Sequence, residues 1–247
     1  MGYHESLTEG RNAVLEAFRS GKTVDRLFVL DGCQDGPVKT ILREAKKQDT
    51  MVQYVKKERL DQLSETKNHQ GVIAYCAACE YAEVSDILEN AKKKGEAPFI
   101  VLLDGIEDPH NLGAIIRTAN QAGAHGVIIP KRRAVGLTAT VAKTSAGAIN
   151  YTPVAKVTNI SKTIEDLKKQ GMWFVCADMD GTTMYDLNLT GPIGLVIGNE
   201  GSGVGRLVKE KCDFVASIPM KGDIDSLNAS VAAGVLAYEI VRQRMTK

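Results

Sequence analysis

The feature that most constrains the fold is a series of short apolar segments between residues 98 and 247. They are Phe99–Leu103, Gly126–Pro130, Trp173–Ala177, Ile193–Ile197 and Phe214–Ile218. Apolar runs of this length are typical of strands that are buried on both faces of a sheet. Helix-like segments at 112–122, 161–170 and 226–242 lie between or after them. This alternation predicts a parallel sheet that is covered by helices on both faces.

The segment that precedes this series predicts a smaller α/β unit. Apolar spacing indicates helices at 8–19, 37–47 and 57–63, and strands at 24–30, 51–55 and 72–75. A chain of 247 residues is long enough for two such units. We therefore expect one domain at residues 1–77, a charged linker at 78–97 and a second domain at 98–247.

The charge balance excludes a uniformly basic surface. The chain has 31 Lys+Arg against 30 Asp+Glu, so a polyanionic partner has to be held by local patches of base. One such patch is the segment Lys39–Arg59, which holds seven basic and three acidic residues. A solvated helix face is the common alternative for such a cluster. The composition is otherwise ordinary for a globular protein and excludes collagen-like, disordered and coiled-coil classes.

The cysteines and the N-terminus indicate a cytosolic protein. The five cysteines are odd in number and dispersed, which argues against a disulfide framework. Cys76 and Cys79 form a CxxC pair, but no second pair at matching spacing completes a zinc site, so we expect no metal. The start of the sequence lacks the apolar run of a signal peptide, and no run is long enough to cross a membrane.

Parallel sheets bind ligands at the carboxyl ends of their strands, and the loop after Leu103 is the first candidate. We expect Asn111 to cap the helix that follows. Arg117 lies among Ala114, Ile115, Ile116 and Ala119, which predicts a partly enclosed guanidinium that needs a carboxylate or phosphate partner.

A glycine-rich loop follows the apolar segment that ends at Ile197. It runs from Gly198 to Gly205 and carries one acid, Glu200. Glycines allow sharp turns and let a ligand approach the backbone closely. The loop lacks the Gly-Lys-Ser/Thr of a Walker motif and the spacing of a dinucleotide fingerprint. A small-ligand loop and a plain turn are both compatible with this pattern.

A third polar loop follows Ile218. We expect Ser226 to cap the last helix and Asn228 to lie in its first turn, where backbone amides and the helix dipole point. The helix carries many small residues, namely Ala229, Ala232, Ala233, Gly234 and Ala237. Small residues predict close packing, either inside the domain or between subunits.

Together the three loops resemble the motifs of the SpoU-type RNA ribose 2′-O-methyltransferases, within the knotted methyltransferase superfamily. Asn-x-Gly-x-x-x-Arg is found at Asn111, Gly113 and Arg117, and Gly-x-Glu-x-x-Gly at Gly198, Glu200 and Gly203. Ile-Pro-Met and Ser-Leu-Asn-x-Ser are found at 218–220 and 226–230. The segments 10–17 and 68–72 resemble the ribosomal-protein-like RNA-binding domain that precedes the catalytic domain in one branch of the family.

The resemblance implies a fold, a cofactor and partners. The expected catalytic domain is a parallel α/β sheet with a deep trefoil knot, an exception to the usual unknotted topology. S-adenosylmethionine would be held near Gly198, Ile218 and Leu227. The expected partners are RNA and a second copy of the chain, with no membrane and no metal.

The resemblance also implies roles for individual residues. Arg117 would stabilise the developing alkoxide of the ribose and clamp a phosphate. Asn111, Glu200, Ser226 and Asn228 would orient Arg117 and the ribose through hydrogen bonds. The N-terminal domain would bind RNA through Arg11, Asn12, Lys46, Lys47 and Gln70.

Several functions fit these motifs. Within the family the chain is most similar to the bacterial branch that methylates a guanosine ribose in the peptidyl-transferase region of 23S rRNA. A tRNA guanosine 2′-O-methyltransferase is the nearest alternative. A non-catalytic RNA-binding assembly factor is a third hypothesis, and a nucleotide-binding oxidoreductase built on the Gly201–Gly205 loop is a fourth. The four polar residues Asn111, Arg117, Glu200 and Asn228 favour a catalyst over a pure binder.

Overall fold

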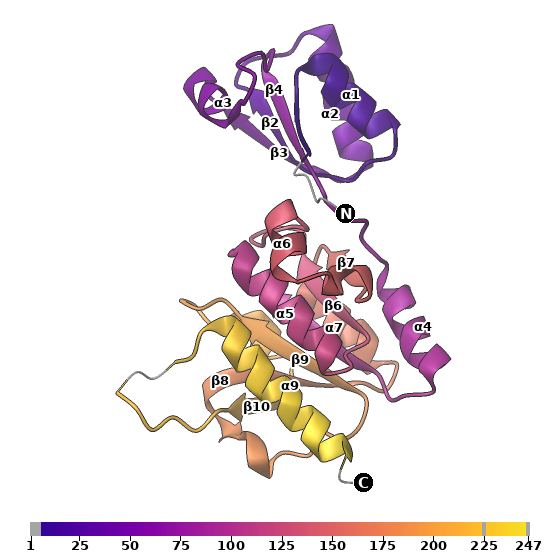
Figure 1. Cartoon of the computed structure of the whole chain (residues 1–247), viewed down its shortest axis with the longest axis vertical. Coiled ribbons are helices and arrows are strands. Elements are labelled where there is room, and N and C mark those ends of the chain that lie inside the picture. Colours follow the sequence, from indigo (N-terminus) through magenta and orange to yellow (C-terminus); the bar gives the residue numbers. More distant parts are fainter. Residues whose placement is uncertain (1–5, 224–225, 246–247) are drawn as a thin grey trace. The chain divides into compact units, whose positions relative to one another are not determined.

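The chain folds into two compact units (Figure 1). The computed structural model describes residues 6–223 and 226–245. The first unit comprises residues 1–80 together with Gly136–Ala139, and the second comprises 81–135 and 140–247. Among the described residues no helix is both long enough and apolar enough to span a bilayer.

The first unit is a mixed four-stranded sheet with helices on both faces. Its strands are β1 (Ser6–Glu9), β2 (Val24–Leu30), β3 (Met51–Val55) and β4 (Val72–Cys76), in the order β1-β4-β2-β3. β4 is antiparallel to β1 and β2, whereas β2 and β3 are parallel. Its helices are α1 (Arg11–Arg19), α2 (Gly36–Lys47) and α3 (Lys57–Leu63).

Successive side chains of β2 explain the two covered faces. Leu27 and Val29 pack with α1 and α2, whereas Phe28 packs with Leu60 of α3. Side chains along a strand alternate between the faces of a sheet, so a fully apolar strand needs helices on both sides.

The sequence predicted a helix at 8–19, but the helix begins later than residue 8. Residues Ser6–Glu9 form strand β1, and the helix begins only at Arg11. Gly10 separates the two elements with a backbone φ of 84°. The strand pairs with β4, almost the whole unit away along the chain. Such a nonlocal pairing overrides local helical spacing.

The second unit contains a six-stranded sheet in which every neighbouring pair is parallel. The order is β10-β8-β9-β5-β6-β7. The strands are β5 (Phe99–Asp104), β6 (Gly126–Pro130), β7 (Val154–Val157), β8 (Trp173–Thr183), β9 (Ile193–Gly198) and β10 (Phe214–Ser217). The prediction of a parallel sheet is confirmed, but it missed the short edge strand β7. The trefoil knot stays a prediction, because strand order does not fix how the chain threads.

Helices cover both faces of this sheet. They are α4 (Val84–Lys94), α5 (Pro109–Gln121), α6 (Ala139–Thr144), α7 (Ile160–Lys168), α8 (Arg206–Lys209) and α9 (Ala229–Met245), with short 3-10 turns at Ala148–Asn150 and Met184–Asp186. Side chains of α4, α7 and α8 form one core with alternate residues of the sheet, such as Ile100, Leu102 and Phe174. α5 contacts β6, α9 contacts β9, and α5 and α9 contact each other.

The segment 78–97, expected to be a linker, contains part of the second unit. Helix α4 spans 11 of its residues, and Ile87 is fully buried against the sheet. The prediction of a linker rested on the many charged side chains of this segment. Of its apolar residues, Ile87 and Ala91 are buried, and Val84 and Leu88 are partly buried against the core of the second unit.

A buried histidine ties α4 to the sheet. His125 is fully buried, its Nδ1 accepts a hydrogen bond from Phe99 N at 3.0 Å, and its Nε2 lies 3.1 Å from Glu96 Oε2. Asn90 Nδ2 of α4 donates to the His125 carbonyl oxygen at 3.1 Å. Because Nδ1 accepts, the proton of the neutral ring lies on Nε2 and is donated to Glu96. Burial lowers the pKa of His125, which the hydrogen bond to Glu96 opposes in part.

We predict that His125→Ala destabilises the second unit more than His125→Asn. Alanine leaves the buried Phe99 amide without an acceptor, at a cost of about 1–3 kcal/mol. The amide oxygen of asparagine can occupy roughly the place of Nδ1. Urea unfolding curves at neutral pH measure the difference, and His110→Ala, at an exposed histidine, is the matched control.

The same variants test the pH dependence of stability. The folded pKa of His125 lies below its unfolded value of about 6.5, so the folded protein binds fewer protons. The stabilising contribution is therefore present above about pH 6.5 and is lost as the pH falls below it. Between neutral and mildly acidic pH, we expect the free energy of unfolding to fall less in His125→Asn than in the wild type. An unchanged pH slope would contradict this assignment.

Candidate active site

One carboxylate joins the three loops that the sequence singled out. Glu200, in the loop after β9, accepts through Oε1 from Asn111 Nδ2 of α5 at 2.9 Å. The same oxygen accepts from Asn228 Nδ2 and from Ala229 N, at 3.3 Å, at the start of α9. Asn228 Nδ2 also donates to Asn111 Oδ1 at 3.0 Å. We call these three residues, Asn111, Glu200 and Asn228, the carboxamide network.

Parallel topology explains why these loops meet. β5 lies beside β9, and β8 lies between β9 and β10. Because all these strands run in the same direction, the loops that follow β5, β9 and β10 leave from one edge of the sheet.

Asn111 is not the cap of its helix, contrary to the sequence prediction. Helix α5 begins two residues earlier at Pro109, and Asp108 is the N-cap, with Oδ1 accepting from His110 N at 2.9 Å. The Asp-Pro pair fits a cap followed by proline at the first helical position. Asn111 is buried inside the first turn, so its side chain is free to bind Glu200 and Asn228.

Ser226 is not the cap of α9 either. The helix begins at Ala229, and Asn228 Oδ1 accepts from Ser230 N at 2.9 Å and from Val231 N at 3.3 Å. Asn228 therefore occupies the capping position. Ser226 is exposed and makes no hydrogen bond to any residue that the structure describes.

The glycine-rich loop is anchored to the end of β5 by residues that sequence analysis did not select. Asn199 Nδ2 donates to the Gly105 carbonyl oxygen at 2.8 Å, and Asp104 Oδ2 accepts from Gly205 N at 2.8 Å. Asn199 and Gly203 also exchange two backbone hydrogen bonds, which close the loop. A side chain at Gly198 would collide with the backbone of Gly203. The signal that could have found Asp104 is an acid at the end of an apolar strand.

Arg117 is exposed, which contradicts the prediction of an enclosed guanidinium. Ile115 and Ile116 of the same helix are buried, whereas Arg117 makes no hydrogen bond or ion pair to any described residue. It lies six residues after Asn111, about 9 Å along the helix axis. The carboxamide network therefore does not orient Arg117 in this structure, and the guanidinium is available to a ligand.

The three residues assigned to the cofactor follow two strands of the same edge. Gly198 is the buried last residue of β9, and Ile218 directly follows β10 and is half-buried. One strand separates β9 from β10, which corresponds to about 10 Å between them. Leu227 is 36% exposed, as an apolar side chain before α9.

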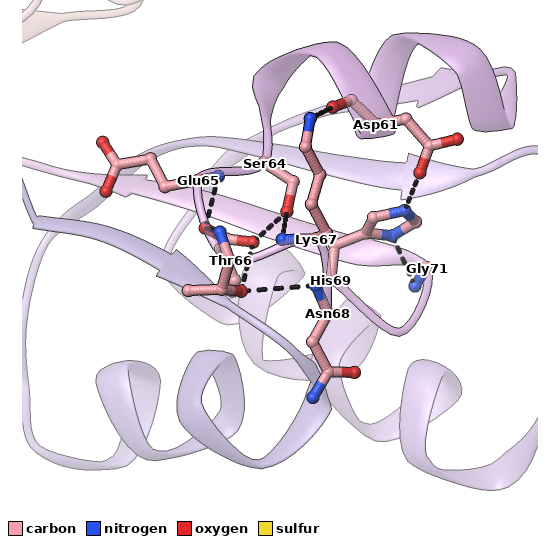
Figure 2. Close-up of polar contacts among 9 residues, drawn as sticks. Asp61, Ser64, Glu65, Thr66, Lys67, Asn68, His69 and Gly71 are labelled. Atoms are coloured by element: carbon pink, nitrogen blue, oxygen red, sulfur yellow. Dashed lines mark hydrogen bonds and ion pairs between the residues drawn. The ribbon is translucent and has the colours of Figure 1, made fainter.

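The first unit carries a second polar network, in the loop before β4 (Figure 2). His69 Nε2 lies 3.0 Å from Asp61 Oδ1, and His69 Nδ1 accepts from Gly71 N at 3.0 Å. Glu9 accepts from the amides of Glu65 and Thr66 at 2.8 and 3.1 Å. These bonds fix the backbone of 64–71 although its tip is exposed.

The structure divides the five predicted RNA-binding residues into two groups. Arg11 Nε donates to the Gln70 carbonyl oxygen at 3.0 Å, and Asn12 follows Arg11 at the start of α1. Arg11 also forms an ion pair of 2.6 Å with Asp35, the N-cap of α2. Lys46 and Lys47 end the same 12-residue helix, about 15 Å further along its axis. Lys47 is paired with Glu44 at 2.9 Å.

No group of three or more His, Cys, Asp or Glu side chains within residues 6–223 and 226–245 is arranged to hold a metal ion. Cys76 and Cys79 are both free thiols, the first buried and the second half-buried. Burial raises the pKa of Cys79, which keeps this thiol protonated.

Comparison with known proteins identifies the family. Residues 98–238 match the model of the SpoU rRNA Methylase family, and residues 7–82 match the model described as RNA 2′-O ribose methyltransferase substrate binding. The chain belongs to the SpoU rRNA methylase family, whose members are RNA methyltransferases. The two matches follow the two α/β units described above.

Relatives with this family's fold match nearly the whole chain. YacO of Bacillus subtilis (strain 168), named as a TrmH family tRNA/rRNA methyltransferase, is 51% identical over 237 residues, covering 95% of this chain and 94% of that protein. A Staphylococcus haemolyticus relative of the same description is 49% identical over 236 residues, covering 95% and 94%. The crystal structure of the SpoU methyltransferase AviRb from Streptomyces viridochromogenes, in complex with the cofactor AdoMet, has a TM-score of 0.62 and 27% identity, covering 98% of this chain and 92% of that chain.

We predict that Glu200→Ala loosens the start of α9 in this SpoU-family protein, whereas Glu200→Gln does so less. Alanine removes the acceptor shared by two side-chain amides and the Ala229 amide. Glutamine keeps a neutral acceptor, and bonds to a charged acceptor are roughly twice as strong. Hydrogen exchange of the Ala229 amide measures the effect. Glu210→Ala, which removes an exposed acid at the end of α8, is the control, and equal exchange in all variants would contradict the prediction.

Proposed function

We propose that this protein transfers a methyl group from S-adenosylmethionine to the ribose 2′-oxygen of an RNA nucleotide. The observation that carries the proposal is the carboxamide network, which joins all three motif-bearing loops at one edge of the sheet. The family match and the AdoMet complex of AviRb support the same assignment. A protein that only bound RNA would not need this arrangement.

The residues at the edge of the sheet suit an adenosine-containing cofactor. The exposed apolar side chains of Leu227 and Met220 offer a surface for a flat purine ring. The glycine-rich loop leaves Ser202 exposed, with no hydrogen bond to any described residue, so its backbone and hydroxyl are available. Gly198, Ile218 and Leu227 would contact the cofactor. When bound, S-adenosylmethionine supplies an electrophilic methyl group on a sulfonium.

The polar residues would stabilise the developing charge and orient the ribose. A ribose hydroxyl is a weak nucleophile until its proton leaves, so negative charge develops on the 2′-oxygen. The exposed Arg117 guanidinium, a permanent cation, would stabilise that charge and clamp the adjacent phosphate. Asn111, Glu200 and Asn228 would hold the loops and orient the ribose, and Ser226 would supply an exposed hydroxyl beside them.

We predict that Arg117→Ala lowers the rate of methyl transfer by about 100-fold to 1,000-fold and leaves cofactor affinity within about twofold. The side chain is exposed and makes no hydrogen bond or ion pair to any described residue, so its removal costs little stability. Loss of one group that stabilises transition-state charge reduces kcat by about 10²–10³. Arg117→Lys, which keeps the charge but not the bidentate fork, should retain part of the activity. Full turnover by Arg117→Ala would refute the assignment.

For the substrate, we propose a guanosine of 23S rRNA in the peptidyl-transferase region, with a tRNA guanosine as the second candidate. The relatives support both classes, because their names join tRNA and rRNA, and one similar structure is that of the A. aeolicus TrmH/SpoU tRNA modifying enzyme. That structure has 27% identity and a TM-score of 0.56, and covers 65% of this chain and 85% of that chain.

The deciding experiment incubates the protein with labelled S-adenosylmethionine and separate, unmodified 23S rRNA and tRNA pools. Label in one pool, followed by mapping of the ribose-methylated nucleotide, identifies the substrate. Absence of transfer to either pool, combined with RNA binding, would favour a non-catalytic assembly factor. Binding of NAD in place of S-adenosylmethionine would favour the oxidoreductase. A cytosolic location follows from the proposed substrates.

We propose that the protein acts as a homodimer through α9. Val231, Tyr238 and Met245 are 50%, 50% and 80% exposed and recur every seven residues, so they share one face of the helix. An apolar stripe of this kind, on a helix rich in small residues, suits a second copy of the same surface. Sedimentation of the wild type and of Tyr238→Glu would measure the dimer and its loss.

We also propose that the first unit binds the RNA, mainly through the group that contains Arg11, Asn12 and Gln70. We predict that the double variant Arg11→Ala/Gln70→Ala weakens RNA binding several-fold, because these residues lie beside a loop that hydrogen bonds fix in place. The variant Lys46→Ala/Lys47→Ala removes the other group and tests it separately. Fluorescence anisotropy with unmodified transcripts measures both. Unchanged binding in the two variants would exclude this unit as the RNA-binding surface.

A further inference from the structure

The loop after β6 carries three consecutive basic residues, Lys131, Arg132 and Arg133. β6 lies beside β5 and parallel to it. The loop therefore leaves from the same edge of the sheet as the loops of the carboxamide network. None of the residues assigned above belongs to it.

Hydrogen bonds fix both ends of this loop. Lys131 N donates to the Val157 carbonyl oxygen of β7 at 2.8 Å, and Val135 N donates to the Ile106 carbonyl oxygen, in the loop after β5, at 2.9 Å. Arg133 between them has a backbone φ of 54°. An arginine is rarely found in this left-handed conformation, which adds to the evidence that the surrounding contacts define the loop.

The loop also touches the segment that anchors the glycine-rich loop. A Cβ atom added to Gly105 would lie 3.8 Å from the Arg133 carbonyl oxygen and 3.6 Å from the Cβ of Asn199. Asn199 binds the Gly105 carbonyl oxygen and directly precedes Glu200. Gly105 therefore lies between the backbone of Arg133 and the loop that holds Glu200.

The two arginines are exposed and without partners. Neither Arg132 nor Arg133 makes a hydrogen bond or ion pair to any residue within 6–223 and 226–245. In a chain with 31 basic and 30 acidic residues, two adjacent unpaired guanidinium groups are a local excess of positive charge. A guanidinium matches the geometry of a phosphate through two parallel hydrogen bonds.

We propose that Arg132 and Arg133 bind RNA phosphates and hold the strand against the edge of the sheet, beside the nucleotide to be methylated. The inference rests on the proposed function, because that function places the target ribose at this edge. A single small anion would need only one of the two guanidinium groups. A flexible polyanion that passes the carboxamide network can engage both.

The test compares the double variant Arg132→Ala/Arg133→Ala with a matched control, Lys92→Ala/Lys94→Ala. The control removes the same charge from exposed residues that end α4, before β5 begins and hence at the opposite end of the sheet. Binding of a fluorescein-labelled oligouridylate is measured by anisotropy over a range of salt concentrations. Thermal unfolding shows that both variants are folded.

We expect the arginine variant to bind the oligouridylate about tenfold more weakly than the control at low salt. The slope of log Kd against log salt should fall by about 1.4, since each phosphate contact on a single strand contributes about 0.7. With a transcript that accepts methyl groups, KM for RNA should rise while KM for S-adenosylmethionine stays unchanged. A purely structural effect would not change the salt slope selectively.

Affinity and salt slope equal to those of the control would overturn the proposal. A rise in KM for S-adenosylmethionine equal to the rise for RNA would also overturn it, because the loop would then act on the cofactor. If the wild type methylates no RNA at all, the proposed function fails. The oligouridylate comparison still decides whether the two arginines bind an RNA backbone, so the two failures are distinguishable.

Discussion

The catalytic unit depends on one acceptor, the Glu200 carboxylate, because it binds loops that are far apart along the chain. Asn111 lies 89 residues before it and Asn228 lies 28 residues after it. Asn111 and Asn228, which are 117 residues apart, also bind each other. Removing the acceptor would leave the Asn111 and Asn228 side-chain amides and the first backbone amide of α9 without their shared partner.

The sheet makes this convergence possible and also defines what surrounds it. Parallel strands bring the loops after β5, β6, β9 and β10 to one edge. Asp104 and Asn199 then fix the glycine-rich loop to the end of β5. Exposed cations lie around this arrangement, namely Arg117 on α5 and Arg132 and Arg133 after β6. A nearly neutral chain can therefore present positive charge where an RNA strand would pass, without a uniformly basic surface.

Local sequence patterns predicted most of the elements, but they failed where a distant partner decides the structure. The apolar runs identified five of the six strands of the second unit, because buried strands are apolar wherever they pair. Strand β1 was mistaken for the start of a helix, since only its pairing with β4 makes it a strand. The caps of α5 and α9 were each placed on the wrong residue, because Asn111 and Ser226 are also good capping types.

The sequence by itself determined the class of fold and the polar loop residues that are candidates for the active site. Both follow from apolar periodicity and loop composition, which are local properties. The family resemblance implied that Asn111, Glu200, Ser226 and Asn228 orient Arg117 and the ribose. The apolar neighbours of Arg117 predicted a partly enclosed guanidinium. Only the tertiary structure decided that Asn111, Glu200 and Asn228 bind each other while Arg117 faces solvent. The physical reason is that the exposure and the hydrogen-bond partners of a side chain depend on which strands are neighbours. No single segment of the sequence determines the order of the strands.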